Sequence, residues 1–300
     1  MRAAPEGDRT GKEPGHFYNR TRRSPSIPGR LLREGKLHLL PLYALLRTSD
    51  LAREGIENSG SYRFADHVYR GRAGGSLGVG KLLDAALLHM RGARSMRSRF
   101  FHVRAELIAA ALRHPADRQF RALSVPCGIA RELVEAAQII RATDPPLYTR
   151  ASFFGIDLDP HPLKLSRELA RGLPGFRFRL ADALDSAGYP PELDVILSTG
   201  LGEFLDDEQL VGFYAVCGAA LRQGGSLVTS GTRRDFVSDY LMRELAELSA
   251  HYREPGELVR LLRRAGFRDI SARRDDVGLQ TLLIARRSTG TPTNESGGTR

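Results

Sequence analysis

A turn of small residues and an acidic side chain further along the chain are the features that could do chemistry. The turn spans residues 126–130 (PCGIA), and the acidic residue is Asp157. A helix that begins directly after such a turn presents unpaired backbone N–H groups and the positive end of its dipole. Gly128 allows close approach to the backbone, and the Asp157 carboxylate can accept hydrogen bonds from both hydroxyls of a ribose. The pattern therefore favours a nucleotide-containing cofactor, which NAD, FAD and S-adenosylmethionine would each satisfy.

Two predicted strands and a helix position these residues. The apolar run 121–125 predicts a short buried strand, and residues 152–157 predict a second strand that ends at the carboxylate. A helix is expected between them, so the segment reads as the first half of a nucleotide-binding βαβ unit. Asp159 precedes Pro160 and is expected to cap the helix that follows.

Four later segments appear in the order expected of one family of enzymes. They are residues 178–183 (FRLADA), 193–200 (LDVILSTG), 221–227 (LRQGGSL) and 265–267 (AGF), the last followed by predicted strands at 268–274 and 279–285. With the turn, they make the stretch from about 118 to 287 resemble a class I S-adenosylmethionine-dependent methyltransferase. The resemblance implies a doubly wound α/β fold with a seven-stranded, mostly parallel sheet. An NAD-linked oxidoreductase is the least favoured alternative, because it has no role for the LxxGG segment and the closing hairpin.

The same resemblance implies which residues bind S-adenosylmethionine. They lie in the first motif, at the end of the second strand, in the 178–183 segment and at the end of the fourth strand: Ser124, Pro126, Cys127, Gly128, Asp157, Leu158, Asp182, Ala183 and Thr199. The Cys127 thiol is interpreted as lining of the turn rather than as a nucleophile, because the sequence places no histidine beside it.

The first motif departs from the family pattern. The family has acidic-x-Gly-x-Gly-x-Gly, whereas this chain has Ser124, Pro126, Gly128 and Ala130 at those positions. The acidic residue usually helps to hold the methionine amino group, and a serine hydroxyl carries no charge. Ser124→Asp is therefore expected to tighten binding at a weak but functional site. A methyltransferase-like binding protein without activity is the non-enzymatic alternative.

The acceptor is expected to bind between two segments outside the sheet. Apolar stripes predict a helical cap over residues 36–115, and an insertion at about 232–254 is expected to form a lid. Tyr62, Arg234 and Tyr240 are the predicted acceptor contacts. The cap could equally be a packing or dimerisation element, which leaves a homodimer open. Three cap arginines, Arg94, Arg97 and Arg99, either clamp an acidic substrate or lie in solvent.

Methyl transfer is an in-line displacement, so alignment of donor and acceptor does most of the work. A hydroxyl or amine acceptor would also need a base, whereas a carboxylate would not. Glu203, which follows the fourth predicted strand, and His251 in the lid are the predicted catalytic residues. The alternative for Glu203 is a structural role at the start of the next helix.

Composition narrows the remaining possibilities. The net charge of +10 comes from the first 115 residues, where 21 Lys and Arg face 10 Asp and Glu, while the rest of the chain has 24 against 25. Only four of the chain's basic residues are lysines, and no nucleic-acid module accompanies them. The expected substrate is therefore a small organic molecule, such as a secondary metabolite or another carboxylate or hydroxyl acceptor, and RNA or protein methylation is the alternative.

No apolar run approaches the ~20 residues of a membrane span. Cys127 and Cys217 lack metal or disulfide spacing, so we expect no metal site and a cytoplasmic location. Residues 1–35 and 288–300 are rich in polar residues, Gly and Pro, which predicts disordered tails. The predicted organisation is thus a tail, a cap over 36–115, a donor-binding domain over 116–287 and a second tail.

Overall fold

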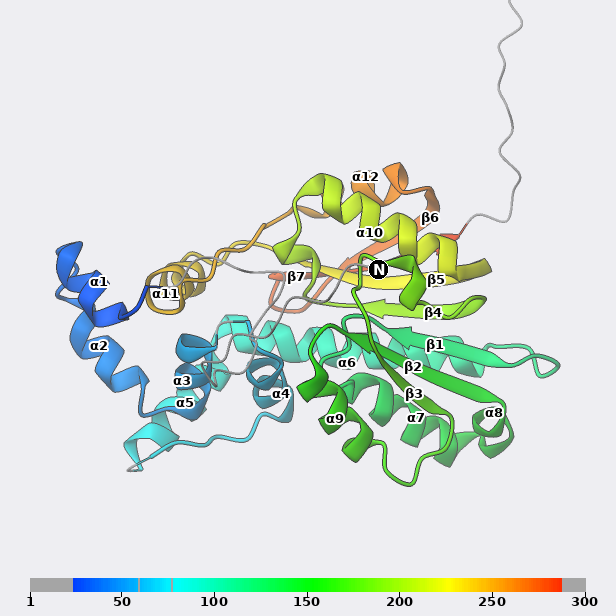
Figure 1. The fold of residues 1–300 in the computed structure, drawn as a ribbon, viewed down its shortest axis with the longest axis horizontal. Coiled ribbons are helices and arrows are strands. Elements are labelled where there is room, and N and C mark those ends of the chain that lie inside the picture. Colours follow the sequence, from blue (N-terminus) through cyan, green and yellow to red (C-terminus); the bar gives the residue numbers. More distant parts are fainter. Residues whose placement is uncertain (1–23, 59, 77, 288–300) are drawn as a thin grey trace, which may run out of the picture.

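The structure is a computed structural model that describes residues 24–58, 60–76 and 78–287. Its centre is a seven-stranded sheet in the order β3-β2-β1-β4-β5-β7-β6 (Figure 1). In chain order the strands are β1 Phe120–Ser124, β2 Ala151–Asp157, β3 Phe176–Leu180, β4 Leu193–Ser198, β5 Leu221–Thr232, β6 Phe267–Arg274 and β7 Gln280–Arg287. Strand β7 pairs antiparallel with β5 and β6, and the other neighbouring pairs are parallel. The predicted doubly wound α/β fold is confirmed.

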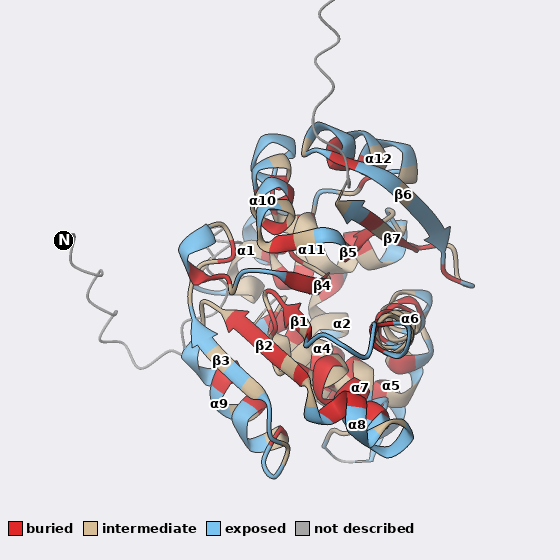
Figure 2. Cartoon of the chain, turned by 90° about the vertical axis from the view of Figure 1, so that its right-hand side faces the viewer, coloured by how far each residue is buried: buried red, intermediate tan, exposed pale blue. Residues whose placement is uncertain are grey.

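Helices cover both faces of this sheet. One face carries α6 (Arg91–Leu112), α7 (Arg131–Thr143), α8 (Pro145–Thr149) and α9 (Pro160–Leu169), and the other carries α10 (Asp207–Ala220) and α12 (Pro255–Arg264) (Figure 1). Every residue of the central strand β4 is buried, whereas most of the edge strand β6 is exposed (Figure 2). A parallel strand covered on both faces is a near-continuous apolar run, and the VIL residues of β4 form such a run between Asp194 and Ser198.

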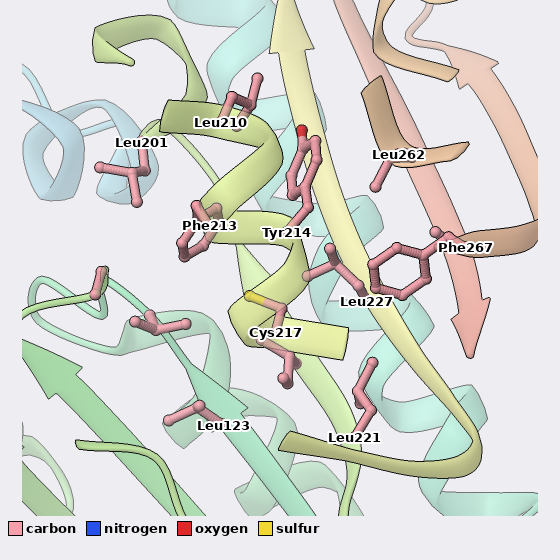
Figure 3. Packing of buried hydrophobic residues seen from close by; sticks show 14 of the residues in the cluster. Leu123, Leu201, Leu210, Phe213, Tyr214, Cys217, Leu221, Leu227, Leu262 and Phe267 are labelled. Atoms are coloured by element: carbon pink, nitrogen blue, oxygen red, sulfur yellow. The ribbon is translucent and has the colours of Figure 1, made fainter. Parts of the chain in front are cut away.

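Two apolar clusters, one on each face, fix the helices. On the first face, Leu107 of α6 and Leu133 of α7 pack with Phe153 and Val195 of the sheet. On the other face, α10 contributes a cluster that packs against β5 and α12 (Figure 3), including Phe213, Tyr214, Cys217, Leu227, Leu262 and Phe267. Strand order reverses between β1 and β4, and this reversal opens a crevice at the carboxyl ends of the two strands.

A cap of short helices lies beyond these strand ends (Figure 1). It consists of α1 (Ile27–Arg33), α2 (Leu39–Leu46), α3 (Asp50–Glu57), α4 (Tyr62–Arg70) and α5 (Val79–His89). The lid helix α11 (Phe236–Ala246) packs with it, since Leu245 shares an apolar cluster with Leu31, Leu39 and Ile56. Cap and lid are therefore one packed unit.

Two details differ from the predicted organisation. Helix α1 lies within the segment expected to be disordered, and its Leu31 is completely buried. Helix α1 has only seven residues and buries Leu31 alone, so the segment shows no apolar periodicity by which it could be predicted. Helix α6 was counted with the cap, yet its second half packs on the sheet. The remaining tail predictions, for residues 1–23 and 288–300, concern residues outside the described part of the chain.

No helix within the described ranges is both long and apolar enough to cross a membrane.

Candidate active site

The turn at residues 126–130, predicted to bind the methyl donor and called the donor turn below, contacts the Asp157 carboxylate directly. The Gly128 N–H donates a hydrogen bond to Asp157 Oδ2 (2.8 Å), and the Asp159 N–H donates to Asp157 Oδ1 (3.0 Å). Gly128 has a φ of +49°, a left-handed conformation that glycine adopts at low cost. Burial raises the pKa of the Asp157 carboxyl, although these backbone hydrogen bonds oppose the shift. The carboxylate therefore ends β2 in a desolvated position next to the turn.

A cavity of about 470 Å³ extends from this turn to the cap and the lid. Six of the nine predicted cofactor residues line it: Pro126, Cys127, Gly128, Asp157, Leu158 and Thr199. Burial raises the pKa of the Cys127 thiol well above its ordinary value, as expected of a lining residue rather than a nucleophile.

The other three predicted cofactor residues lie outside the cavity lining. Ala183 is buried in the apolar core beside α10, and an Asp182 carboxylate oxygen accepts a hydrogen bond from the Leu184 N–H (2.8 Å). Ser124 is buried at the end of β1, where its hydroxyl donates to Glu132 Oε1 (2.8 Å). The motifs predict that these residues lie near the crevice. In the structure the side chains of all three contact neighbouring protein groups instead of lining the cavity.

Two charged residues of the cavity were not among the predicted donor contacts. Glu132 is the second residue of α7, and Arg99 extends from the middle of α6. Burial raises the pKa of the Glu132 carboxyl, and the positive charge of Arg99 opposes that shift. For Arg99 the sequence allows either a clamp on an acidic substrate or a position in solvent. The side chain is only 6% exposed, so it does not lie in solvent. The sequence did not predict that Arg99 and Glu132 line the same cavity, because they lie on different helices, α6 and α7.

Glu203 is the predicted base that the structure does place in the cavity. It lies in a 3-10 turn, η2 (Gly202–Phe204), directly after β4, and is 7% exposed. The Thr232 hydroxyl donates to Glu203 Oε1 (2.6 Å), and Arg99 Nη1 lies 3.7 Å from the same oxygen. Glu203 Oε2 is buried and has no hydrogen-bond partner among the described residues. A buried carboxylate oxygen without a partner is costly and typical of functional sites.

The predicted lid and base residues His251, Arg234 and Tyr240 are not brought to the cavity. The His251 side chain is exposed, and only its backbone N–H reaches the site, where it donates to the Glu203 carbonyl (2.7 Å). Arg234 pairs with the buried carboxylate of Asp239 in α11 (2.7 Å), and Tyr240 is 39% exposed. The face of α11 that meets the cavity carries Leu241 and Leu245, whereas Phe236 and Tyr240 are exposed.

Tyr62, the remaining predicted acceptor contact, lies over the donor turn. A Cβ added at Gly128 would lie 3.4 Å from the Tyr62 Cβ. The rest of the chamber is mostly apolar, with side chains from the cap and the lid: Leu46, Leu51, Ile56, Phe64, Leu87, Met90, Met96, Leu241, Met242, Leu245 and Leu248. Among the described residues, no group of three or more His, Cys, Asp or Glu side chains could hold a metal ion.

The fold and the crevice define a protein of the class I methyltransferase type. Among solved structures, a possible exported protein from Bordetella parapertussis is similar over 87% of this chain and 93% of its own, with a TM-score of 0.70 and 21% identity. The S-adenosylmethionine-dependent methyltransferase SibL is similar over 89% of this chain and 79% of its own (TM-score 0.52, 18% identity). Magnesium protoporphyrin IX methyltransferase from Synechocystis PCC 6803, with bound S-adenosylhomocysteine, is similar over 80% of this chain and 100% of its own (TM-score 0.51, 13% identity).

The model of the family Methyltransf_20, described as "Putative methyltransferase", matches residues 48–287. The chain belongs to this family. A search of curated proteins finds no match.

Proposed function

We propose that this protein transfers a methyl group from S-adenosylmethionine to a small organic molecule with a large apolar body. The observation that carries the proposal is one continuous cavity that joins the Gly128 and Asp157 donor site to an apolar chamber of cap and lid residues. The turn would hold the cofactor through backbone N–H groups, and the Asp157 carboxylate would accept hydrogen bonds from its ribose. When bound, S-adenosylmethionine supplies an electrophilic methyl group next to the chamber.

The charges around the cavity favour an acceptor that carries an X–H group over a carboxylate. Of the described residues, three arginines line the cavity and each is paired, Arg99 with Glu203 (3.7 Å), Arg131 with Asp66 (2.6 Å) and Arg233 with Glu254 (2.8 Å). Six acidic residues of the same described part line it: Asp66, Glu132, Asp157, Asp159, Glu203 and Asp235. This excess of acidic groups would repel a carboxylate. It would also repel a phosphate backbone, which argues against RNA as the substrate.

Glu203 is the residue we propose as general base. A hydroxyl or amine of the acceptor would donate a hydrogen bond to its carboxylate. Attack of that hydroxyl or amine on the methyl carbon would leave the electron pair of the carbon–sulfur bond on sulfur, and Glu203 would accept the proton. Thr232 and Arg99 hold the carboxylate in place, so little reorganisation is needed.

Calorimetric titration with S-adenosylmethionine and S-adenosylhomocysteine tests the donor site. Wild-type protein should bind both in the micromolar range, Asp157→Ala should bind neither, and Asp276→Ala, an exposed carboxylate in the β6–β7 turn, should bind as wild type. Absence of heat with the folded wild-type protein would overturn the proposal in favour of the non-catalytic alternative.

A further inference from the structure

We propose that Glu132 binds the positively charged amino group at the methionine end of S-adenosylmethionine, from a helix rather than from the end of β1. The inference deepens the proposed function and rests on it. In this proposal Glu132 of α7 supplies the negative charge that the first motif lacks at Ser124. Ser124 acts as a positioning residue, because its hydroxyl holds the Glu132 carboxylate.

The first argument is the contact between the two side chains. Ser124 donates its hydroxyl hydrogen to Glu132 Oε1 (2.8 Å), so the glutamate carboxylate lies at the end of β1 although its backbone belongs to α7. This is the only hydrogen bond that the Glu132 side chain makes with another described residue. Glu132 is a lining residue of the cavity and Ser124 is not.

The second argument is the order of the strands. Asp157 ends β2, Ser124 ends the neighbouring β1, and Thr199 follows β4 on its other side. A donor with its ribose at Asp157 and its methyl group directed at Glu203 would cross the end of β1. Its amino-acid portion is attached at the sulfur, so Ser124 and Glu132, which meet at the end of β1, would lie within reach of that portion.

The third argument is charge. Arg99 Nη1 lies 3.7 Å from Glu203 Oε1, whereas among the described residues no Lys, Arg or His nitrogen lies within ion-pair distance of the Glu132 carboxylate. Glu132 thus sits in a partly desolvated place with a hydrogen bond from Ser124 and no cationic partner in contact. A buried charge without a full partner is costly, and an ammonium group would supply that partner. The Glu132 carboxylate would also stabilise the positive charge of the donor's sulfonium group.

The geometry also changes the expectation for Ser124→Asp. With Glu132 already hydrogen-bonded to Ser124, a second carboxylate would stand against the first. We therefore expect Ser124→Asp alone to weaken donor binding, contrary to the expectation from the motif. The same substitution should help only when Glu132 has lost its charge.

Variants that move the carboxylate from residue 132 to residue 124 test this inference, with binding measured by calorimetry. Glu132→Gln should weaken binding of S-adenosylmethionine about 10- to 100-fold, and the double variant Glu132→Gln/Ser124→Asp should recover most of the loss. Methylthioadenosine, which lacks the amino-acid portion, should bind Glu132→Gln as it binds wild type. That ligand also verifies that the variant is folded with an intact donor turn.

Glu208→Gln is the matched control, because Glu208 is the second residue of α10 as Glu132 is of α7, but lies outside the cavity. Unchanged S-adenosylmethionine binding by Glu132→Gln would overturn the inference while leaving the proposed function intact. Equal losses for S-adenosylmethionine and methylthioadenosine would also overturn it, because they would show general damage to the site. If wild-type protein binds neither ligand, the proposed function itself fails.

Discussion

Asp66 in cap helix α4 accepts a hydrogen bond from Arg131 Nε at 2.6 Å, which ties the cap to the first residue of α7. Arg131 directly follows the donor turn, and Tyr62 of α4 packs over Gly128 in that turn. The cap is therefore attached to the donor site itself and not only to the acceptor chamber. Ordering of the cap and binding of the donor should be coupled.

We expect Asp66→Asn to weaken S-adenosylmethionine binding several-fold, because a hydrogen bond to a charged group contributes about 1.5–3 kcal/mol. Calorimetry measures the affinity, and hydrogen exchange should show faster exchange in α4. Asp50→Asn removes a pair with Arg53 whose partners are both about 40% exposed, and should change neither quantity. Equal effects of the two variants would argue against coupling through Asp66.

Glu203→Gln should lower kcat with a hydroxyl or amine acceptor by about 10²- to 10⁴-fold, the usual contribution of a positioned base. Donor affinity of the same variant should change far less than kcat, since the proposed role of Glu203 is to accept a proton from the acceptor. Single-turnover rates with acceptors found by screening give the first quantity and calorimetry the second. A variant with full activity would remove Glu203 from the mechanism.

Donor binding should depend on pH in the acid range. Burial raises the pKa values of Asp157 and Glu132 above the ordinary values of about 3.9 and 4.3. The donor favours both ionised forms, so protonation competes with binding, and affinity should fall as the pH drops through the raised pKa values. Binding near these pKa values should release protons, which calorimetry in two buffers of different ionisation enthalpy detects. Proton uptake would contradict the assignment of both residues.

Helix α1 should stabilise the lid. Leu31 is fully buried against the cluster that includes Leu245 of α11, and Arg30 Nε pairs with Glu247 of the same region (2.9 Å). Leu31→Ala should cost about 2–5 kcal/mol of stability and increase hydrogen exchange in α11. The neighbouring Leu32 is 55% exposed, so Leu32→Ala is the control and should have little effect. A lid unaffected by Leu31→Ala would show that α1 is not needed to hold it.

Much of the donor side could be read from the sequence because its signals are local. The apolar runs of β1, β2 and β4 predict buried strands, and Gly128 and Asp157 stand at strand ends, where adjacent parallel strands bring side chains together. The acceptor side was harder. Periodicity showed that α11 has an apolar face, but Tyr240 and Phe236 are on the exposed side, because rotation of a helix against its neighbours depends on residues elsewhere in the chain.

By itself the sequence determined the order of the elements, the sheet, the turn at residues 126–130 and the Asp157 carboxylate beside it, since each depends on residues within one strand or turn. Only the tertiary structure decided that Glu132 reaches Ser124, that Arg99 pairs with Glu203, and that Arg234 and His251 stay out of the cavity. Those relationships join helices, strands and turns that are separated along the chain. They depend on how the helices pack across the strand ends, because burial of apolar faces, rather than spacing in the sequence, sets where each charged side chain is held.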